Sequence, residues 1–291
     1  MDLKELQEHL DKIVMKQNHQ ALPDFDGYSP FEMHQILHFT FGADSPITLH
    51  KLSDSEYQQI PMLNQVKHLL KLIDQSGEMK LTKKGFLPTV VVSDLYKQGY
   101  LKDKFIEKGY SKLYKEMDSG SVHLTRILTE LTGLVKKRKG KLSLTKASAK
   151  IISDNERLFR LLLSTYTKKF NWAYLDGYGD NQIGQLGFGF SLILLSKYGN
   201  KQHSESFYSE KYFNAFPALL KTIDPGYSTI EKYATGCYSL RTFENFLKHF
   251  GLIEIEEKGK MLDLVRYITK TSLFDILITC KPHQHQKQSH R

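Results

Sequence analysis

The sequence has few cysteines and no long apolar segment. It contains two cysteines in 291 residues, Cys237 and Cys280, too few for a disulfide framework or a cysteine metal cluster. No apolar run approaches the roughly 20 residues that span a bilayer, and the longest, near 188–195, is predicted to be a buried helix segment. The amino terminus, MDLKELQEHLDKIV, lacks the apolar core of a signal peptide. We therefore expect a reduced, cytoplasmic protein without a membrane partner.

The chain carries an excess of positive charge. It has 41 Lys and Arg against 32 Asp and Glu, a formal net charge of +9 and a pI of about 9.2. Such an excess favours polyanionic partners through long-range attraction and counterion release. The alternative is a lysine-rich globular protein whose charges only keep it in solution.

Two segments of the sequence follow one pattern. ILTELTGLVKKRKGKLSLTKASAKII and FLKHFGLIEIEEKGKMLDLVRYITKTSLFDIL each contain an apolar helix, Gly-Leu, a strand, a polar turn with glycine, a strand ending in Thr-Lys and an apolar helix. MKLTKKGFLPTVVV carries a similar Leu-Thr-Lys-Lys-Gly ending at 81–85, without an evident first hairpin strand. The sequence thus predicts two or three related units, near 62–98, 105–152 and 228–279.

This pattern resembles the carboxyl-terminal half of a winged-helix domain, as in MarR-like and PadR-like bacterial regulators. The whole chain is also similar to bacterial proteins of uncharacterised function that carry these elements. We expect a mainly helical α+β fold, with two or three winged-helix-like units joined by helical segments. The expected divisions are an N-terminal helical region (1–60), a tandem winged-helix-like region (61–154), a helical linker domain (155–227), a C-terminal winged-helix-like unit (228–280) and a disordered tail (281–291).

The turn of the second unit is a candidate phosphate-binding surface. Of the six residues at 136–141, five are cationic: Lys136, Lys137, Arg138, Lys139 and Lys141. Like charges in one short turn repel each other, so a compensating polyanion is expected more often than for an average loop. Phosphate contacts position a protein without specifying sequence. The alternatives are an ordinary charged turn and a nuclear localisation signal, which a bacterial chain would not use.

The helix at 239–250 is the candidate reading helix of the third unit, because the second helix of a helix-turn-helix enters the major groove. Its predicted outward set is Arg241, Thr242, Asn245, Lys248 and His249, opposite a buried stripe of Leu240, Phe243, Phe246, Leu247 and Phe250. Arg and Asn make bidentate contacts with guanine and adenine. Arg241, Asn245 and Lys248 are therefore candidate DNA-binding residues, and a solvated helix face is the alternative.

The other two candidate DNA surfaces are weaker. The corresponding helix of the second unit is expected to offer His123, Arg126, Thr129 and Glu130, of which Glu130 would face phosphate unfavourably. The first strand of the third hairpin, 253–257, is acidic and does not favour a phosphate backbone either.

No catalytic, cofactor or metal site is complete in the sequence. His34 and His38 are one helical turn apart, as in zinc-protease helices, but Gln35 stands where those helices place the general base. We expect a binding protein without cofactor or metal and not an enzyme. It is either a DNA-binding regulator or a protein–protein scaffold whose winged units bury their would-be reading helices. The oligomeric state is left open.

Overall fold

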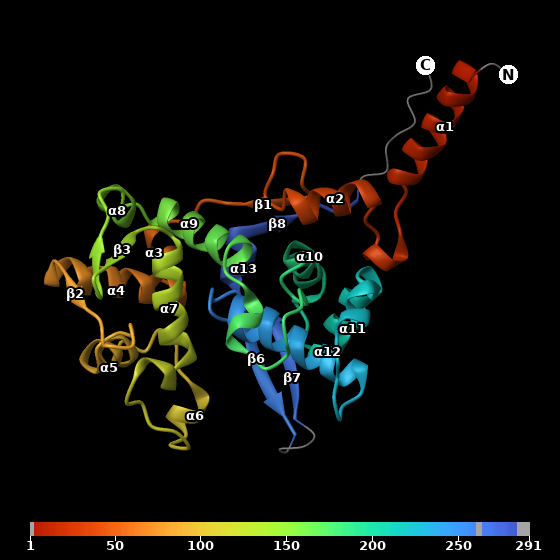
Figure 1. The fold of residues 1–291 in the computed structure, drawn as a ribbon. Coiled ribbons are helices and arrows are strands. Elements are labelled where there is room, and N and C mark those ends of the chain that lie inside the picture. Colours follow the sequence, from red (N-terminus) through yellow and green to blue (C-terminus); the bar gives the residue numbers. More distant parts are fainter. Residues whose placement is uncertain (1–2, 260–263, 284–291) are drawn as a thin grey trace. The chain divides into compact units, whose positions relative to one another are not determined.

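The computed structural model describes residues 3–259 and 264–283 (Figure 1). It is 55% helical with small antiparallel sheets, a mixed α and β fold. The chain divides into two compact units. Unit 1 consists of 1–50, 177–248 and 252–291, and unit 2 consists of 51–176 and 249–251. The expected linker segment 155–227 is thus shared between the units. No helix among the described residues has the length and apolarity to cross a membrane.

Unit 2 is a set of helices packed on a three-stranded sheet. Its helices are α3 (Asp54–Tyr57), α4 (Pro61–Ser76), α5 (Thr89–Lys97), α6 (Lys104–Glu107), η2 (Glu116–Asp118), α7 (Gly120–Leu131), α8 (Ser148–Ile152), α9 (Asn155–Lys168) and η3 (Trp172–Leu175). Pro61 begins α4, where its fixed φ suits the first helical position. The buried stripe of α4, including Leu63, Leu70 and Ile73, packs against α7 and the sheet.

The sheet of unit 2 joins segments that the sequence analysis assigned to separate units. Its strands are β2 (Met79–Lys80), β3 (Val135–Arg138) and β4 (Lys141–Leu144), in the order β2-β4-β3. Met79 pairs with Leu142, so β2 is the third strand of the hairpin sheet and not the remnant of another hairpin. The segments near 62–98 and 105–152 therefore form one sheet-bearing module.

Unit 1 contains helices from both ends of the chain and from its middle. They are α1 (Leu3–Asn18), η1 (Pro23–Phe25), α2 (Pro30–His38), α10 (Phe188–Tyr198), α11 (Glu205–Ala215), η4 (Pro217–Thr222), α12 (Ile230–Tyr238), the π-helix η5 (Ser239–Leu247) and α13 (Ser272–Leu277). Helix α2 begins with the full capping box of Ser29 and Glu32. Residues Phe188–Leu195 of α10 are buried, as expected from their apolar run.

Two sheets complete unit 1. The strands β5 (His203–Ser204), β7 (Val265–Lys270) and β6 (Ile253–Lys258) form one sheet in that order, and β1 (Ile47–Leu49) pairs antiparallel with β8 (Ile278–Cys280). The second predicted hairpin is therefore present, and β5 is an additional strand on it. Most of the predicted disordered tail lies outside the described residues. Within 281–283, His283 Nδ1 lies 2.7 Å from a carboxylate oxygen of Glu32.

Both three-stranded sheets have the same connectivity. In unit 2 the order is α4, β2, α5, α7, β3, β4, and in unit 1 it is α10, β5, α11, α12 with η5, β6, β7. In each sheet the last strand lies between the other two. The recurrence seen in the hairpins therefore extends to whole modules, 61–144 and 188–270.

The helix expected at 239–250 is a π-helix that ends at Leu247. We predicted that Arg241 and Thr242 face outward on it, and this prediction is wrong. Both side chains are fully buried. Arg241 donates to the carbonyl oxygens of Asn181 (2.8 Å) and Gly179 (2.9 Å). The amide of Lys248 bonds five residues back, to Phe243. The predicted buried stripe is confirmed for Phe243, Phe246, Leu247 and Phe250. The π-type spacing differs from that of an α-helical wheel, and Arg241 and Thr242 are buried together with this stripe.

We predict that Arg241→Met destabilises unit 1. The substitution leaves buried carbonyl groups without their donor, which costs about 1–3 kcal/mol for each unsatisfied group. Urea unfolding followed by circular dichroism should show this destabilisation. The control is Lys248→Met, at an exposed position of the same helical region, which should change stability by less than about 0.5 kcal/mol. Unchanged stability of Arg241→Met would mean that the buried contacts of Arg241 are not structural.

Candidate nucleic-acid interface

The hairpin of β3 and β4 is closed by a tight turn. Arg138 pairs with Lys141, so Lys139 and Gly140 form the two-residue loop. Both have positive φ, 47° and 70°, as a type I′ turn requires. Lys139 adopts a backbone conformation that is uncommon for a residue with a side chain. The hairpin therefore keeps a cation at a position where asparagine or glycine would fit the backbone better.

Strand pairing divides the side chains of this sheet between two faces. Met79 and Leu142 are buried on the inner face, towards α4. Because paired residues share a face and side chains alternate, Lys80, Lys141 and Arg138 lie side by side on the outer face. Lys136, opposite Ser143, belongs to the same face. We call Lys80, Lys136, Arg138 and Lys141 the cationic sheet face.

The cationic sheet face works against the stability of the sheet. Like charges directly opposite each other on neighbouring strands are destabilising, and here Lys141 has a cation opposite it on each side. Glu78 offsets part of the repulsion, because its carboxylate lies 2.6 Å from Lys141 Nζ. This bond, with the charge of Lys136 nearby, lowers the pKa of the Glu78 carboxyl. The remaining cations are exposed to solvent.

A second basic turn adjoins the hairpin. The amide of Leu81 donates to the carbonyl of Gly140 over 2.8 Å. Lys137 Nζ lies 3.1 Å from the point that a Cβ on Gly85 would occupy, so its ammonium group sits against the turn that carries Lys83 and Lys84. Both of these lysines are exposed. The two turns together form one continuous basic surface.

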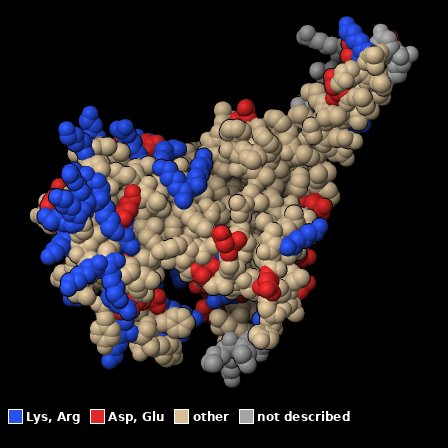
Figure 2. Space-filling view, in the orientation of Figure 1, with Lys and Arg blue, Asp and Glu red and all other residues tan. Residues whose placement is uncertain are grey.

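Positive charge is concentrated in unit 2. Its segments contain 24 Lys and Arg against 13 Asp and Glu, a net charge of +11, whereas unit 1 has 17 against 19, a net charge of −2. Figure 2 shows the cationic side chains gathered over the part of the chain that carries α4 to α8. The charge of the whole chain therefore comes from unit 2.

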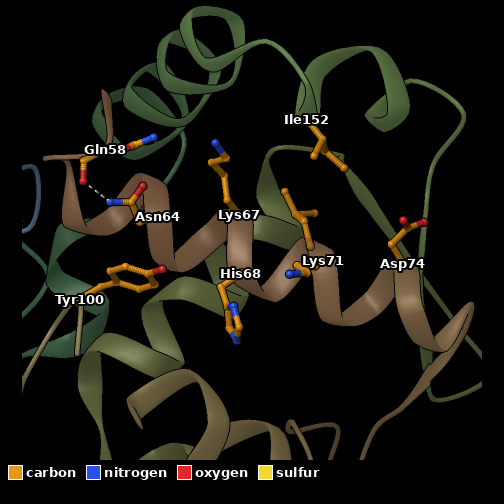
Figure 3. Close-up of a pocket in the computed structure, with 9 residues that line it drawn as sticks. Gln58, Asn64, Lys67, His68, Lys71, Asp74, Tyr100 and Ile152 are labelled. Atoms are coloured by element: carbon orange, nitrogen blue, oxygen red, sulfur yellow. Dashed lines mark hydrogen bonds between the residues drawn. The ribbon is translucent and has the colours of Figure 1, made fainter. Parts of the chain in front are cut away.

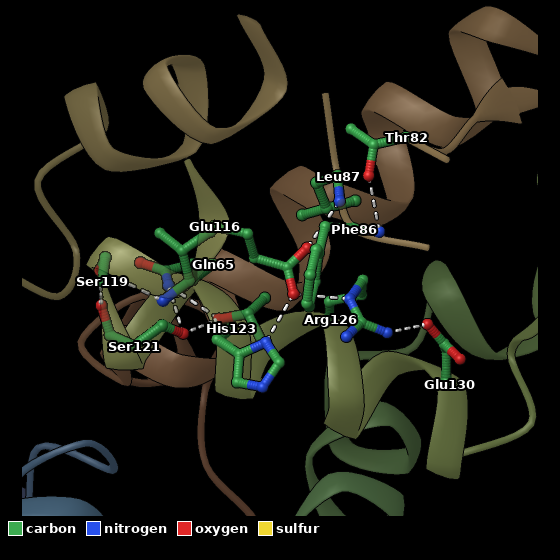
Figure 4. A network of polar contacts seen from close by, with 12 residues as sticks. Gln65, Thr82, Phe86, Leu87, Glu116, Ser119, Ser121, His123, Arg126 and Glu130 are labelled. Carbon is green, nitrogen blue, oxygen red and sulfur yellow. Dashed lines mark hydrogen bonds and ion pairs between the residues drawn. The ribbon is translucent and has the colours of Figure 1, made fainter. Parts of the chain in front are cut away.

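The polar side chains of α7 point into unit 2 around one buried carboxylate, Glu116 (Figure 4). The Nδ1 atom of His123 lies 2.6 Å from Glu116 Oε1, and Arg126 Nε donates to the same oxygen over 2.7 Å. The amide of Leu87 donates to Glu116 Oε2 over 2.6 Å. Arg126 also pairs with Glu130. This network joins η2, α7 and the segment that leads into α5.

Burial overturns the expected exposure of α7. His123, Arg126 and Thr129 were predicted to face outward, and all three are buried. Burial alone would raise the pKa of Glu116, but its hydrogen bonds to His123, Leu87 and Arg126 outweigh that effect and lower it. The helix therefore contributes its charged groups to the interior of unit 2.

The structure separates the predicted binding residues into two groups. Lys136, Lys137, Arg138, Lys139 and Lys141 are exposed on one hairpin. In unit 1, Arg241 is buried, Asn245 is half-buried and Lys248 is exposed. The β6 strand of that unit places Glu254, Glu256 and Glu257 beside β7, so its hairpin is acidic as expected. Sequence reasoning did not single out Lys80, Lys83 and Lys84, although Leu81–Gly85 was noted as a motif.

An open pocket of about 690 Å³ lies along the exposed side of α4 (Figure 3). It is lined by Gln58, Asn64, Lys67, His68, Leu70, Lys71, Asp74, Tyr100 and Ile152. Several of its polar groups bond to the protein itself: Lys67 donates to Asn155 over 2.7 Å, and His68 Nε2 lies 2.8 Å from Asp94. Among the described residues, no group of three or more His, Cys, Asp and Glu side chains is placed to hold a metal ion.

Comparison with known proteins gives one partial match. Residues 58–157 match the family model of the Y4jL N-terminal domain. The matched segment includes α4, the three-stranded sheet and the Glu116 network of unit 2. No curated protein and no solved structure matched the chain.

We predict that Glu116→Gln destabilises unit 2 at neutral pH. Removing one partner of a buried ion pair costs about 3–5 kcal/mol. Because the pKa of Glu116 is lower in the folded state, its contribution is fully present above the unfolded-state pKa and is lost as pH falls through the folded-state pKa. The variant should therefore lose less stability on acidification. Urea unfolding followed through Trp172, the single tryptophan and a buried residue of unit 2, measures both effects.

The matched control is Glu130→Gln, at the more exposed end of the same network. It should reduce stability by less than Glu116→Gln does, because Glu130 is partly accessible and Arg126 keeps its bond to Glu116. Equal stability of Glu116→Gln and the unsubstituted protein at neutral pH would contradict the structural role of the network.

Proposed function

We propose that the chain is a nucleic-acid-binding protein built on two winged-helix modules, and that the hairpin of unit 2 contacts the phosphates of duplex DNA. The winged-helix assignment rests on connectivity. Each module has the order helix, strand, helix, helix, hairpin, with the last strand between the other two. Binding is the proposed role, without a catalytic step, in the setting of a cytoplasmic bacterial regulator.

The observation that carries the proposal is the row of Lys80, Lys141 and Arg138 across three strands. Such a row lowers the stability of the sheet and is neutralised when a polyanion lies over it. The basic turn and the net charge of unit 2 extend the same surface. Because phosphate groups carry no base identity, this surface supports orientation and affinity more than sequence selection.

Reading of bases by the helices is not part of the proposal. Arg241 is buried in unit 1, and the polar residues of α7 are engaged with Glu116 in unit 2. This burial also favours a second candidate, a protein–protein scaffold in which winged-helix modules serve as packing units. The scaffold leaves the uncompensated cations of the hairpin unexplained, so nucleic-acid binding is preferred.

The first test is a titration of mixed-sequence duplex DNA at several salt concentrations. We expect affinity to fall steeply with salt, and the log–log slope to become smaller by roughly 0.9 for each phosphate that a variant no longer neutralises. The variant replaces Lys136, Lys137, Arg138 and Lys139 with Gln. The matched control replaces Lys4, Lys12, Lys16 and Lys201 of unit 1, all exposed, with Gln and removes the same number of charges.

A control variant that behaves like the unsubstituted protein, beside a hairpin variant with a reduced slope, supports the proposal. Equally weakened binding in both variants would mean that DNA affinity depends on the total charge of the chain and not on the hairpin, which would contradict the proposal. Absence of duplex binding even at low salt would reject the proposal.

A substitution that removes a negative charge instead of positive ones gives a second test. Glu78→Gln removes the carboxylate that pairs with Lys141 and leaves the cationic sheet face with one more uncompensated charge. We expect duplex affinity to rise by several-fold at low salt and the gain to shrink as salt screens the surface. Fluorescence anisotropy with labelled duplex measures the change. Weaker binding by Glu78→Gln would contradict phosphate contact at this face.

A further inference from the structure

Residues 100–115 of unit 2 combine exposed aromatic rings with lysines. The segment runs from the end of α5 through α6 towards η2. Its aromatic residues are Tyr100, Phe105, Tyr110 and Tyr114, and its lysines are Lys102, Lys104, Lys108, Lys112 and Lys115. The two kinds alternate along the chain, so the segment presents both ring faces and positive charge.

Three of the rings lie well outside the core. The exposed fractions are 63% for Phe105, 76% for Tyr110 and 66% for Tyr114. Aromatic side chains are large contributors to burial in folded proteins, and clusters of exposed apolar groups mark interaction sites. We call Phe105, Tyr110 and Tyr114 the aromatic platform.

Hydrogen bonds order the backbone that carries the rings, although no core covers the rings themselves. Asp103 caps α6 by accepting from the amide of Phe105 over 2.9 Å. Gly109, with a φ of 73°, turns the chain so that the amides of Tyr110 and Ser111 donate to the carbonyl of Phe105 over 2.9 and 3.1 Å. This turn brings the rings of Phe105 and Tyr110 to a centroid distance of 6.5 Å.

The backbone at the third ring is held in a similar way. The amides of Tyr114 and Lys115 both donate to one carboxylate oxygen of Asp118 over 2.9 Å. An exposed ring on an ordered backbone binds a flat partner with little loss of conformational entropy. The backbone of the platform is therefore held by contacts within the chain itself.

The charge of the segment 100–115 is positive, because its five lysines outnumber its two acids, Asp103 and Glu107. Asp103 is the cap of α6. Glu107 accepts from Tyr96 Oη over 2.9 Å and lies 3.4 Å from Lys102 Nζ. Lys108, Lys112 and Lys115 are exposed. A polyanion with flat apolar groups complements this surface in both respects.

We propose that the aromatic platform stacks the unpaired bases of a single nucleic-acid strand, while the neighbouring lysines follow its phosphates. This inference rests on the proposed function and names the substrate class: DNA or RNA with an unpaired segment. Single-strand binding surfaces combine stacking rings with a positively charged track. In a duplex the base faces are already stacked on each other, so the rings have nothing to cover there.

A protein partner fits the surface less well. The buried centres of protein–protein interfaces are depleted of lysine, whereas here a lysine lies within a few residues of each ring in the chain. A single nucleic-acid strand would contact the aromatic rings with its bases and the lysines with its phosphates.

The test uses a single-stranded oligonucleotide that carries 2-aminopurine, whose fluorescence falls when it stacks on a ring. We expect the full chain to quench it and to bind this strand more tightly than the matching duplex. Replacing Phe105, Tyr110 and Tyr114 with Leu keeps an apolar surface but removes the rings. This variant should abolish quenching, and each ring removed should weaken binding about five-fold or more.

Two controls separate stacking from other effects. Tyr110→Phe with Tyr114→Phe keeps the rings and should bind and quench like the unsubstituted chain. Val90→Ala removes an exposed apolar side chain elsewhere in unit 2 and should have no effect. Because the platform residues are exposed, thermal unfolding of the variants should be unchanged.

Single-strand binding and quenching by the Leu variant at the level of the unsubstituted chain would overturn the inference, as expected if the rings dock a protein. The proposed function would survive that result, provided that duplex binding still depended on the hairpin lysines. If neither form of nucleic acid binds, both proposals are overturned.

Discussion

The buried carboxylate of Glu116 decides which surfaces of unit 2 are available for function. A carboxylate without solvent needs donors on its oxygens, and His123, Arg126 and the amide of Leu87 supply them. Two of these donors come from α7. The residues of α7 that were predicted to face outward are thereby engaged in the interior, whereas the hairpin and the segment before η2 present exposed cations and rings.

The same contacts attach those two surfaces to the rest of unit 2. Glu116 begins η2, directly after the aromatic platform, and holds it against α7 and the entrance to α5. At the other end of α7, Gly133 turns the chain into β3, with a φ of 74°. The platform and the cationic sheet face are thus attached to opposite ends of one buried helix. Changes that loosen the Glu116 network should disturb both surfaces together.

Short patterns in the sequence predict those structural features that depend on interactions between neighbouring residues. The hairpin around Gly140 was predicted because neighbouring residues fix it. Local signals of the same kind are the capping box of Ser29 and Glu32 and Pro61 at the start of α4. The strands β2 and β5 were not recognised as partners of the hairpins, since two residues carry no periodicity and their pairing spans about 60 residues. The burial of Arg241 was missed because a helical wheel assumes α-helical spacing.

The exposed cations at 136–141 were predicted correctly as a basic turn, yet the sequence could not show their neighbours. The row across β2, β4 and β3 depends on register, which no local pattern near Lys80 reveals. The aromatic platform had a signal, the alternation of Tyr, Phe and Lys over 100–115. Alternation in sequence does not tell whether rings are buried, so this signal alone does not identify the platform.

The two modules show how a repeated fold can carry surfaces of opposite charge. In unit 1 the position of the basic hairpin is taken by β6 with Glu254, Glu256 and Glu257. Arg266 of β7 pairs there with Glu244 at 2.9 Å and with Glu205 at 3.2 Å. Burial, the largest effect on Glu244, raises the pKa of its carboxyl, and the nearby carboxylates of Glu257 and Glu205 act in the same direction.

In the hairpin of unit 1, Arg266 lies 3.9 Å from Glu257 and Lys258 lies 3.4 Å from Glu256, whereas most of the hairpin cations of unit 2 face solvent. Since the backbone connectivity is the same, this difference arises from side chains alone. Charge at a hairpin is thus independent of the fold that presents it, which is why the basic run at 136–141 indicates a partner more strongly than the fold itself does.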